Sequence, residues 1–215
     1  MYEIGKKHNT DKITHHRYHE IYPTFIQKFY QKEGGIVEIG IAREASLKMW
    51  LELFPKMHIY GIDINVEKEG PRFNVLKVDQ GSEDDLDHFV EQIHHPIYFI
   101  NDDGSHVPEH QLLTFNKLFP VLEVGGVYII EDIETSYWTK GYLYGYTFQY
   151  GYEHPKSIVQ IFKSAVDCVN SDFAGVHESP IHHLDSIQSI TFARNCIIIT
   201  KKTPEKRGYG YAHYL

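Results

Sequence analysis

The chain has 215 residues, of which 42% are hydrophobic and 23% charged, and its formal net charge is −8 at pH 7. This length and composition predict one globular domain. The negative charge disfavours binding to a nucleic-acid backbone, and no apolar run reaches the about 20 residues that span a bilayer. Two cysteines make neither a disulfide framework nor a zinc cage. Because the N-terminus also lacks an apolar signal core, we expect a reducing, cytoplasmic (intracellular) location.

Strands and helices alternate along most of the chain. Apolar residues at spacings of three and four predict a helix over residues 11–33, which Pro23 kinks or restarts. The predicted strands cover residues 35–40, 58–64, 73–79, 97–102 and 126–132. The predicted helices cover residues 45–54, 83–93, 109–122 and 155–170, and residues 186–202 form two strands that turn at Arg194 and Asn195.

This alternation predicts an α/β fold with a mostly parallel sheet, helices on both faces and a closing antiparallel hairpin strand. We expect a single domain, in which an N-terminal helical segment (1–34) precedes an α/β core (35–202) and a tail (203–215). Ligand sites in such sheets lie outside the carboxyl ends of the strands. The residues that follow each strand are therefore the candidates for function.

Small and acidic residues follow the first two predicted strands. Gly40, Ala42 and Ala45 occupy the three small positions of a turn like Gly-x-Gly-x-x-Gly, which is weak support for a dinucleotide because two of the glycines are missing. A tight strand-to-helix turn would have the same pattern. Asp63 ends the second strand, where a carboxylate can accept hydrogen bonds from both hydroxyls of a ribose.

The third predicted strand ends in Asp79 and Gln80, which are placed to meet an adenine edge. A single carboxylate at such a position is more often a helix cap or a solvated charge than a ligand. Several in successive strand-end positions favour an adenosine-containing ligand. The chain contains no Gly-x-x-x-x-Gly-Lys-Ser/Thr phosphate loop, which argues against an ATPase.

The fourth and fifth predicted strands end in "NDDGSH" (101–106) and "EDIETSYW" (131–138). If these strands are neighbours, their ends lie about 5 Å apart, and Asp103, Glu131 and Asp132 can converge on one ion. Oxygen ligands select Mg²⁺, Mn²⁺ or Ca²⁺ rather than zinc. His106, three residues after Asp103, can serve as a general base. Either stretch alone would also fit a capping turn with a surface histidine.

The stretch "DDGSH…FPVLEVGGVYIIEDIETSYW" resembles the Mg²⁺-dependent sugar O-methyltransferases of macrolide-antibiotic biosynthesis, and parts of it resemble the cephalosporin hydroxylase-like family. The upstream "NTDKITHHRYHEIYPTF" is similar to the N-terminal Thr-Asp-Lys…His-x-Tyr segment of the same enzymes. The motifs "EIG…SLKMW" and "YGIDI" match their first two strands. The similarity covers roughly residues 8–140. The chain departs from the family in its glycine-poor loop and in lacking the large N-terminal domain of some members.

The resemblance implies a Rossmann-like class I fold of seven strands that binds S-adenosylmethionine and Mg²⁺ or Mn²⁺. By position, it implies His106 as the base and three metal ligands: Asp103, Glu131 and Asp132. The residues that we assign to the cofactor site are Lys12, Glu38, Gly40, Ala42, Asp63, Asp79, Gln80 and Asp102.

The leading hypothesis is methyl transfer from S-adenosylmethionine to a sugar hydroxyl of a nucleotide sugar, a glycan or a glycosylated small molecule, with the metal chelating a vicinal diol. Tyr137, Trp138 and Tyr142 could stack on the sugar, although an oligomer contact or an ordinary loop core fits them as well. Two alternatives stay open: a methyltransferase acting on a catechol or another non-sugar diol, and a non-catalytic cofactor- or carbohydrate-binding module. We expect a homo-oligomer with neither nucleic-acid nor membrane partners.

Overall fold

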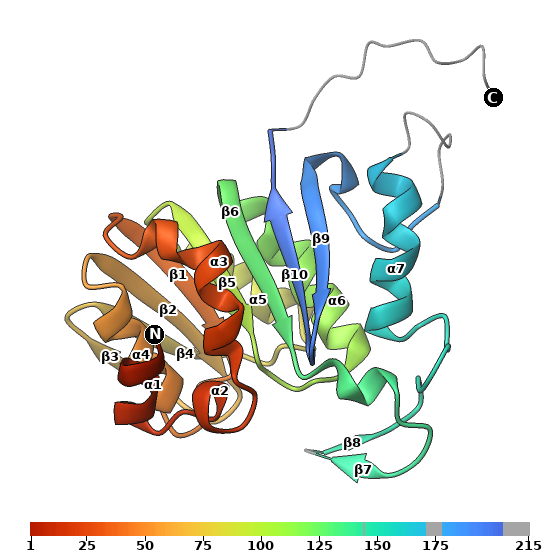
Figure 1. The fold of residues 1–215 in the computed structure, drawn as a ribbon, viewed down its shortest axis with the longest axis horizontal. Helices are drawn as coiled ribbons and strands as arrows, with labels where there is room; N and C mark the ends of the chain where they lie inside the picture. Colours follow the sequence, from red (N-terminus) through yellow and green to blue (C-terminus); the bar gives the residue numbers. More distant parts are fainter. Residues whose placement is uncertain (144, 171–177, 204–215) are drawn as a thin grey trace.

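The structure is a computed structural model that describes residues 1–143, 145–170 and 178–203. Its centre is an eight-stranded sheet with the strand order β3-β4-β2-β1-β5-β6-β10-β9 (Figure 1). The strands are β1 (Gly34–Ile39), β2 (Met57–Asp63), β3 (Lys68–Gly70), β4 (Phe73–Lys77), β5 (Ile97–Asp102), β6 (Leu122–Glu131), β9 (Ile187–Ala193) and β10 (Cys196–Lys201). The predicted tail lies outside the described residues from position 204 onward.

The pairing of the strands confirms the predicted α/β fold. Strands β4, β2, β1, β5 and β6 run parallel, whereas β10 pairs antiparallel with β6 and β9 antiparallel with β10. The predicted neighbourhood of the fourth and fifth strands is also confirmed, because β5 pairs with β6 and Asp102 lies opposite Ile130. The sheet has eight strands rather than the expected seven, because the short strand β3 pairs with β4 at one edge.

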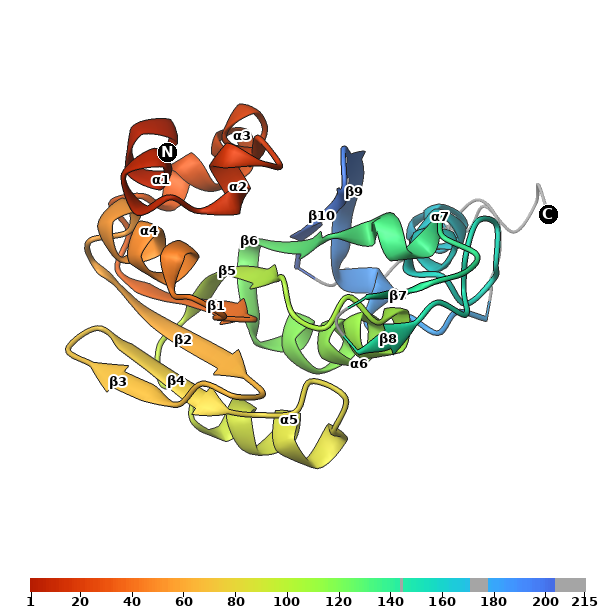
Figure 2. The ribbon, with the colours of Figure 1, turned by 90° about the horizontal axis from the view of Figure 1, so that it is seen from below.

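Helices cover both faces of the sheet (Figure 2). They are α1 (Tyr2–His8), α2 (Asp11–Thr14), α3 (Tyr22–Ile26), α4 (Ala45–Leu53), α5 (Glu83–Glu91), α6 (Pro108–Leu118) and α7 (Ile158–Val169). The N-terminal segment and α4 share one core with Trp50 and Phe99, whereas α5, α6 and α7 share the other with Phe115 and Tyr128. Among the described residues, no helix is long and apolar enough to cross a membrane.

The prediction of a helix over residues 11–33 is wrong in its length, whereas the predicted restart at Pro23 is confirmed by α3. The segment consists of α2, the 3₁₀ turn Tyr18–Glu20, α3 and a second 3₁₀ turn. Arg17 interrupts it with a left-handed backbone (φ 59°), and the proline near the start of α3 suits a new helix rather than a continued one. The apolar spacing still identified a buried face, because Tyr18, Tyr22 and Ile26 are buried. Helix α1 was not predicted.

Gly40 holds the ends of β1 and β5 close together. Its backbone has a φ of 85°, and a Cβ atom added there would overlap the backbone carbonyl of Asp103. The amide of Asp103 in turn donates to the carbonyl of Ile39 at 2.9 Å. The loop after β1 therefore depends on a residue without a side chain, and so does the placement of Asp103.

We expect Gly40→Ala to be much more destabilising than Gly125→Ala, measured by urea unfolding. Both glycines have a positive φ, but an added Cβ at Gly125 would meet no atom within 4 Å. Gly125→Ala should therefore cost only the about 1–2 kcal/mol of a left-handed non-glycine residue. Gly40→Ala adds about 1–3 kcal/mol for forcing packed atoms apart. Equal losses in the two variants would contradict the proposed close contact.

Candidate active site

Three chemically active side chains converge beyond the carboxyl ends of β5 and β6. Asp103, His106 and Asp132 each offer one ligand atom, and these atoms all lie within 4.8 Å of one another. Asp103 directly follows β5, and Asp132 directly follows β6. The parallel pairing of these two strands thus brings together residues that are 29 positions apart, as the sequence predicted. An arrangement of two carboxylates and one imidazole can hold a divalent cation.

The N-terminal segment places the ammonium group of a lysine beside this cluster. Lys12 is fully buried, and its Nζ donates to Asp103 at 2.6 Å and to Glu131 at 2.8 Å. Burial alone would lower the pKa of Lys12, but the charges of Asp103 and Glu131 raise that pKa well above its usual value. Tyr22 donates to the second oxygen of Glu131 at 2.7 Å. Lys12 therefore lies in the acidic cluster, and both oxygens of Glu131 already have partners.

Asp132 has donors mainly on one of its two carboxylate oxygens. Its Oδ1 accepts from Asn195 Nδ2 at 2.8 Å and from the Tyr18 hydroxyl at 3.5 Å, and His16 Nε2 lies 3.6 Å away. Its Oδ2 lies 3.8 Å from His106 Nε2. Burial, followed by the neighbouring acids, raises the pKa of Asp132 to about 8. A bound cation would relieve this electrostatic cost.

His106 is held in an unusual backbone conformation next to the two carboxylates. Its φ is 56°, its carbonyl accepts from the Thr135 hydroxyl at 2.9 Å, and only 7% of the residue is exposed. Burial lowers the pKa of its imidazole, which favours the neutral form. Asp132 and Asn195 also have positive φ angles. Such backbone outliers cluster at functional sites more often than elsewhere.

The loop after β1 is tied to the end of β2 by Asp63. One oxygen of Asp63 accepts from the amides of Ile41 and Ala42, and the other accepts from those of Asn65 and Val66. Although burial opposes it, these four backbone donors lower the pKa of Asp63. The carboxylate is thus ionised and shapes the small-residue turn that the sequence assigned to the cofactor.

The next predicted cofactor residues fall into an exposed and a buried group. Asp79 lies in a turn and accepts from the amide of Gly81. Gln80 is buried, donates to Asp102 at 2.8 Å and accepts from the amide of Ser105. Asp102 is fully buried, and this burial raises its pKa to about 7. Gln80 and Asp102 therefore hold the loop of residues 103–106 in place through the hydrogen bond that Gln80 accepts from Ser105.

Glu38 is also fully buried, within β1. Trp50 donates to one of its oxygens at 2.8 Å, and burial raises its pKa to about 7. Glu38 has no exposed surface in this conformation, so a ligand cannot contact it directly.

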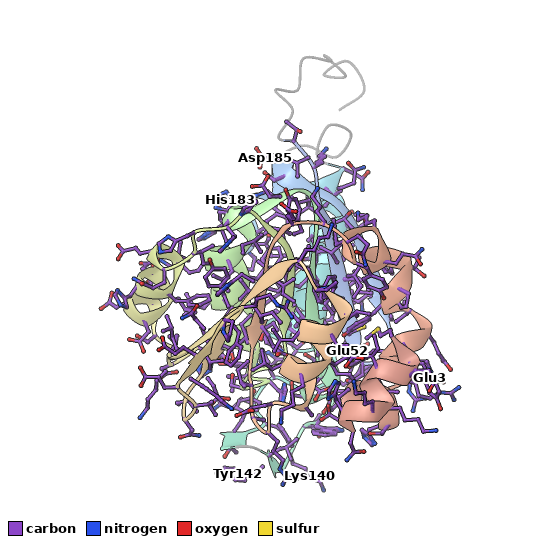
Figure 3. All side chains as sticks on the ribbon, turned by 90° about the vertical axis from the view of Figure 1, so that its left-hand side faces the viewer. Glu3, Glu52, Lys140, Tyr142, His183 and Asp185 are labelled. Atoms are coloured by element: carbon purple, nitrogen blue, oxygen red, sulfur yellow. The ribbon has the colours of Figure 1, made fainter. Side chains whose placement is uncertain are left out.

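Aromatic residues follow the acidic cluster in the chain. Tyr137, Trp138 and Tyr142 are exposed, and the last of these lies in the small hairpin of β7 (Tyr142–Leu143) and β8 (Tyr146–Thr147). Figure 3 places Tyr142 at the end of the molecule opposite His183 and Asp185. The carboxyl ends of the parallel strands point toward the same end as this hairpin (Figure 1).

Three residues of this region are not among the site residues predicted from the sequence: Asn195, which is predicted only as a turn residue, Tyr22 and His16. Only Asn195 carried a usable signal, because a hairpin that closes the sheet beside the strand with the acidic end must bring its turn near that end.

No family model matches the chain. It is 29% identical over 217 residues to 8-demethyl-8-alpha-L-rhamnosyl tetracenomycin-C 2'-O-methyltransferase from Streptomyces olivaceus. The aligned region covers 95% of this chain and 55% of the relative. It is 30% identical to mycinamicin VI 2''-O-methyltransferase from Micromonospora griseorubida, over 63% of this chain and 36% of the relative. The chain thus spans about half the length, or less, of these curated relatives.

The comparison with solved structures leads to the same group of proteins. The MycE methyltransferase of the mycinamycin biosynthetic pathway, solved in complex with Mg and SAH, superposes with a TM-score of 0.84 at 25% sequence identity, over 98% of this chain and 56% of that chain. These similarities confirm the resemblance seen in the motifs. The chain is therefore similar in sequence to these O-methyltransferases and shares the class I methyltransferase fold of MycE.

Proposed function

We propose that this chain is a metal-dependent O-methyltransferase that transfers a methyl group from S-adenosylmethionine to a hydroxyl of a sugar. The observation that carries the proposal is the convergence of Asp103, His106 and Asp132 at the ends of β5 and β6. It is supported by the names of two relatives, a 2'-O-methyltransferase of a rhamnosyl tetracenomycin-C and a mycinamicin VI 2''-O-methyltransferase, and by MycE, which was solved with Mg and SAH. The homo-oligomer and the reducing compartment remain predictions.

The side chains present fit a divalent cation. Asp103 and Asp132 offer hard oxygen ligands; the hydrogen bond from Asn195 goes to Oδ1 of Asp132, and Oδ2 lies 3.8 Å from His106 Nε2. Glu131, the third predicted ligand, already accepts from Lys12 on one oxygen and from Tyr22 on the other, so these donors would compete with a cation for it. A divalent cation held here would bind two vicinal oxygens of the acceptor and lower the pKa of the hydroxyl to be methylated.

The chain's own residues then divide the remaining tasks. His106 accepts the proton of the acceptor hydroxyl, and its buried, neutral imidazole suits that role. Gly40, Ala42, Asp63 and Asp79 would hold the cofactor, whereas Lys12, also assigned to it, lies within the acidic cluster. Glu38, Gln80 and Asp102 are all buried, so they would act on the cofactor indirectly, by holding the loops around it in place. The exposed rings of the predicted acceptor residues, Tyr137, Trp138 and Tyr142, offer apolar faces to the sugar.

We expect turnover to require a divalent cation and cofactor binding to be independent of it. The acidic cluster lies at β5 and β6, whereas the cofactor residues follow β1, β2 and β4. EDTA should abolish the release of S-adenosylhomocysteine with a screened set of sugar acceptors, and Mg²⁺ or Mn²⁺ should restore it. Calorimetry with S-adenosylmethionine on the same samples provides the control. Full turnover after exhaustive chelation would overturn the role of the metal.

Asp63→Ala should weaken S-adenosylmethionine binding by more than about 1.5 kcal/mol, the scale of lost hydrogen bonds to a charged group. The substitution removes the carboxylate that shapes the loop at Ile41 and Ala42. Asp63→Asn keeps the size and one acceptor oxygen and should give an intermediate loss. Isothermal titration calorimetry measures the affinities, and thermal melting verifies the fold. Unchanged affinity in a folded Asp63→Ala variant would remove this residue from the cofactor site.

His106→Ala should lower kcat by about 10²–10⁴, the usual contribution of a positioned base. Binding of S-adenosylmethionine and Mg²⁺ should stay close to that of the wild type. His88→Ala is the matched control, because that histidine is exposed on α5. If His106→Ala instead loses affinity for the cation, the imidazole is a metal ligand and the base has to be sought elsewhere.

A further inference from the structure

The turn that closes the β9–β10 hairpin lies against the candidate site. Strand β10 pairs antiparallel with β6 so that Cys196 faces Glu131. Asn195, the residue just before Cys196, therefore lies beside the residue that follows β6. It has a left-handed backbone with a φ of 58°, a conformation that asparagine tolerates better than most residues.

Both polar atoms of the Asn195 side chain, and its backbone carbonyl oxygen, form hydrogen bonds with residues of the site region. Its Nδ2 donates to Asp132 Oδ1 at 2.8 Å, and its Oδ1 accepts from the backbone amide of Glu134 at 3.1 Å. Its carbonyl oxygen accepts from the Tyr18 hydroxyl at 3.1 Å. One turn residue thus connects the acidic end of β6, the 3₁₀ turn that follows it and the N-terminal segment.

These contacts fix the orientation of the Asp132 carboxylate. With Oδ1 held by the amide of Asn195, the other oxygen, Oδ2, lies on the side of His106. We propose that Asn195 is a positioning residue for a divalent cation. Its side-chain amide holds Asp132 so that Oδ2 faces Asp103 and His106. The inference rests on the proposed function, since it assumes that a cation binds at this cluster.

The geometry separates this role from that of an ordinary turn. The turn needs only a residue that adopts a positive φ, and glycine does so at little cost. The side-chain amide is not needed to close the hairpin, yet both of its polar atoms have partners on the segment of residues 132–134. Groups that orient a metal ligand in this way typically change metal affinity by about 10–100-fold when they are removed.

Asn195→Gly tests the proposal, because it keeps the left-handed turn and removes only the side-chain amide. Arg194→Ala, in the same turn but exposed, is the matched control. The readouts are Mn²⁺ affinity by calorimetry, the electron paramagnetic resonance spectrum of bound Mn²⁺, and the rise in melting temperature that Mn²⁺ produces. We expect Asn195→Gly to bind Mn²⁺ about 10–100-fold more weakly with an altered spectrum, and Arg194→Ala to behave like the wild type.

The possible failures are distinguishable. If the wild type binds Mn²⁺ and folded Asn195→Gly binds it equally well, the role of Asn195 is overturned and the proposed function stands. If Arg194→Ala weakens binding as much as Asn195→Gly, the effect belongs to the turn as a whole, and the assignment to the amide is overturned. If the wild type binds no Mn²⁺, the metal-dependent function fails and this inference fails with it.

Discussion

The buried ammonium of Lys12, held between Asp103 and Glu131, is the interaction on which the rest of the site depends. Transferring these charges out of water is costly, and the cost is offset only when each charge has close partners. Removing one partner of a buried pair typically costs about 3–5 kcal/mol, because the remaining charge is left uncompensated. The N-terminal segment, β5 and β6 are therefore tied together by electrostatics as well as by their shared apolar core. Tyr22 strengthens this connection by donating to the same Glu131.

This arrangement divides the acidic cluster into two parts with different properties. Glu131 is almost fully buried, and the buried ammonium of Lys12 balances its charge. Asp132 and the exposed side of Asp103 remain available to an external ligand, and the pKa of Asp132 is raised to about 8, first by burial and then by Asp103. The buried ammonium of Lys12 thus makes it possible for three acids to lie close together in space. Asp132, whose Oδ2 lies 3.8 Å from His106 Nε2, has Lys12 only as a more distant charge.

The sequence predicted the strand-end chemistry because that chemistry follows from local patterns. Short apolar runs located β1, β2, β5 and β6, and the parallel α/β arrangement then required Asp63, Asp103 and Asp132 to lie at one edge. Orientation was beyond such reasoning. Nothing in the neighbourhood of Glu131 signals that its oxygens meet Lys12 and Tyr22, since those partners are more than 100 residues away in the chain. The strand β3 was missed because three exposed or half-exposed residues carry no apolar alternation.

The two halves of the site are built by different means, and this has a consequence for how each forms. The proposed cofactor half is local: Asp63 binds backbone amides that lie within about two dozen positions of it, in the adjoining loops after β1 and β2. The proposed metal half brings together side chains at positions 12, 103, 106, 132 and 195, and it forms only when the N-terminal segment and the closing hairpin have both docked on the sheet. Long-range contacts of this kind are lost first when either segment opens locally. Binding of a cation should therefore favour the docked state of the N-terminal segment and of the closing hairpin, because a ligand stabilises the conformation to which it binds more tightly.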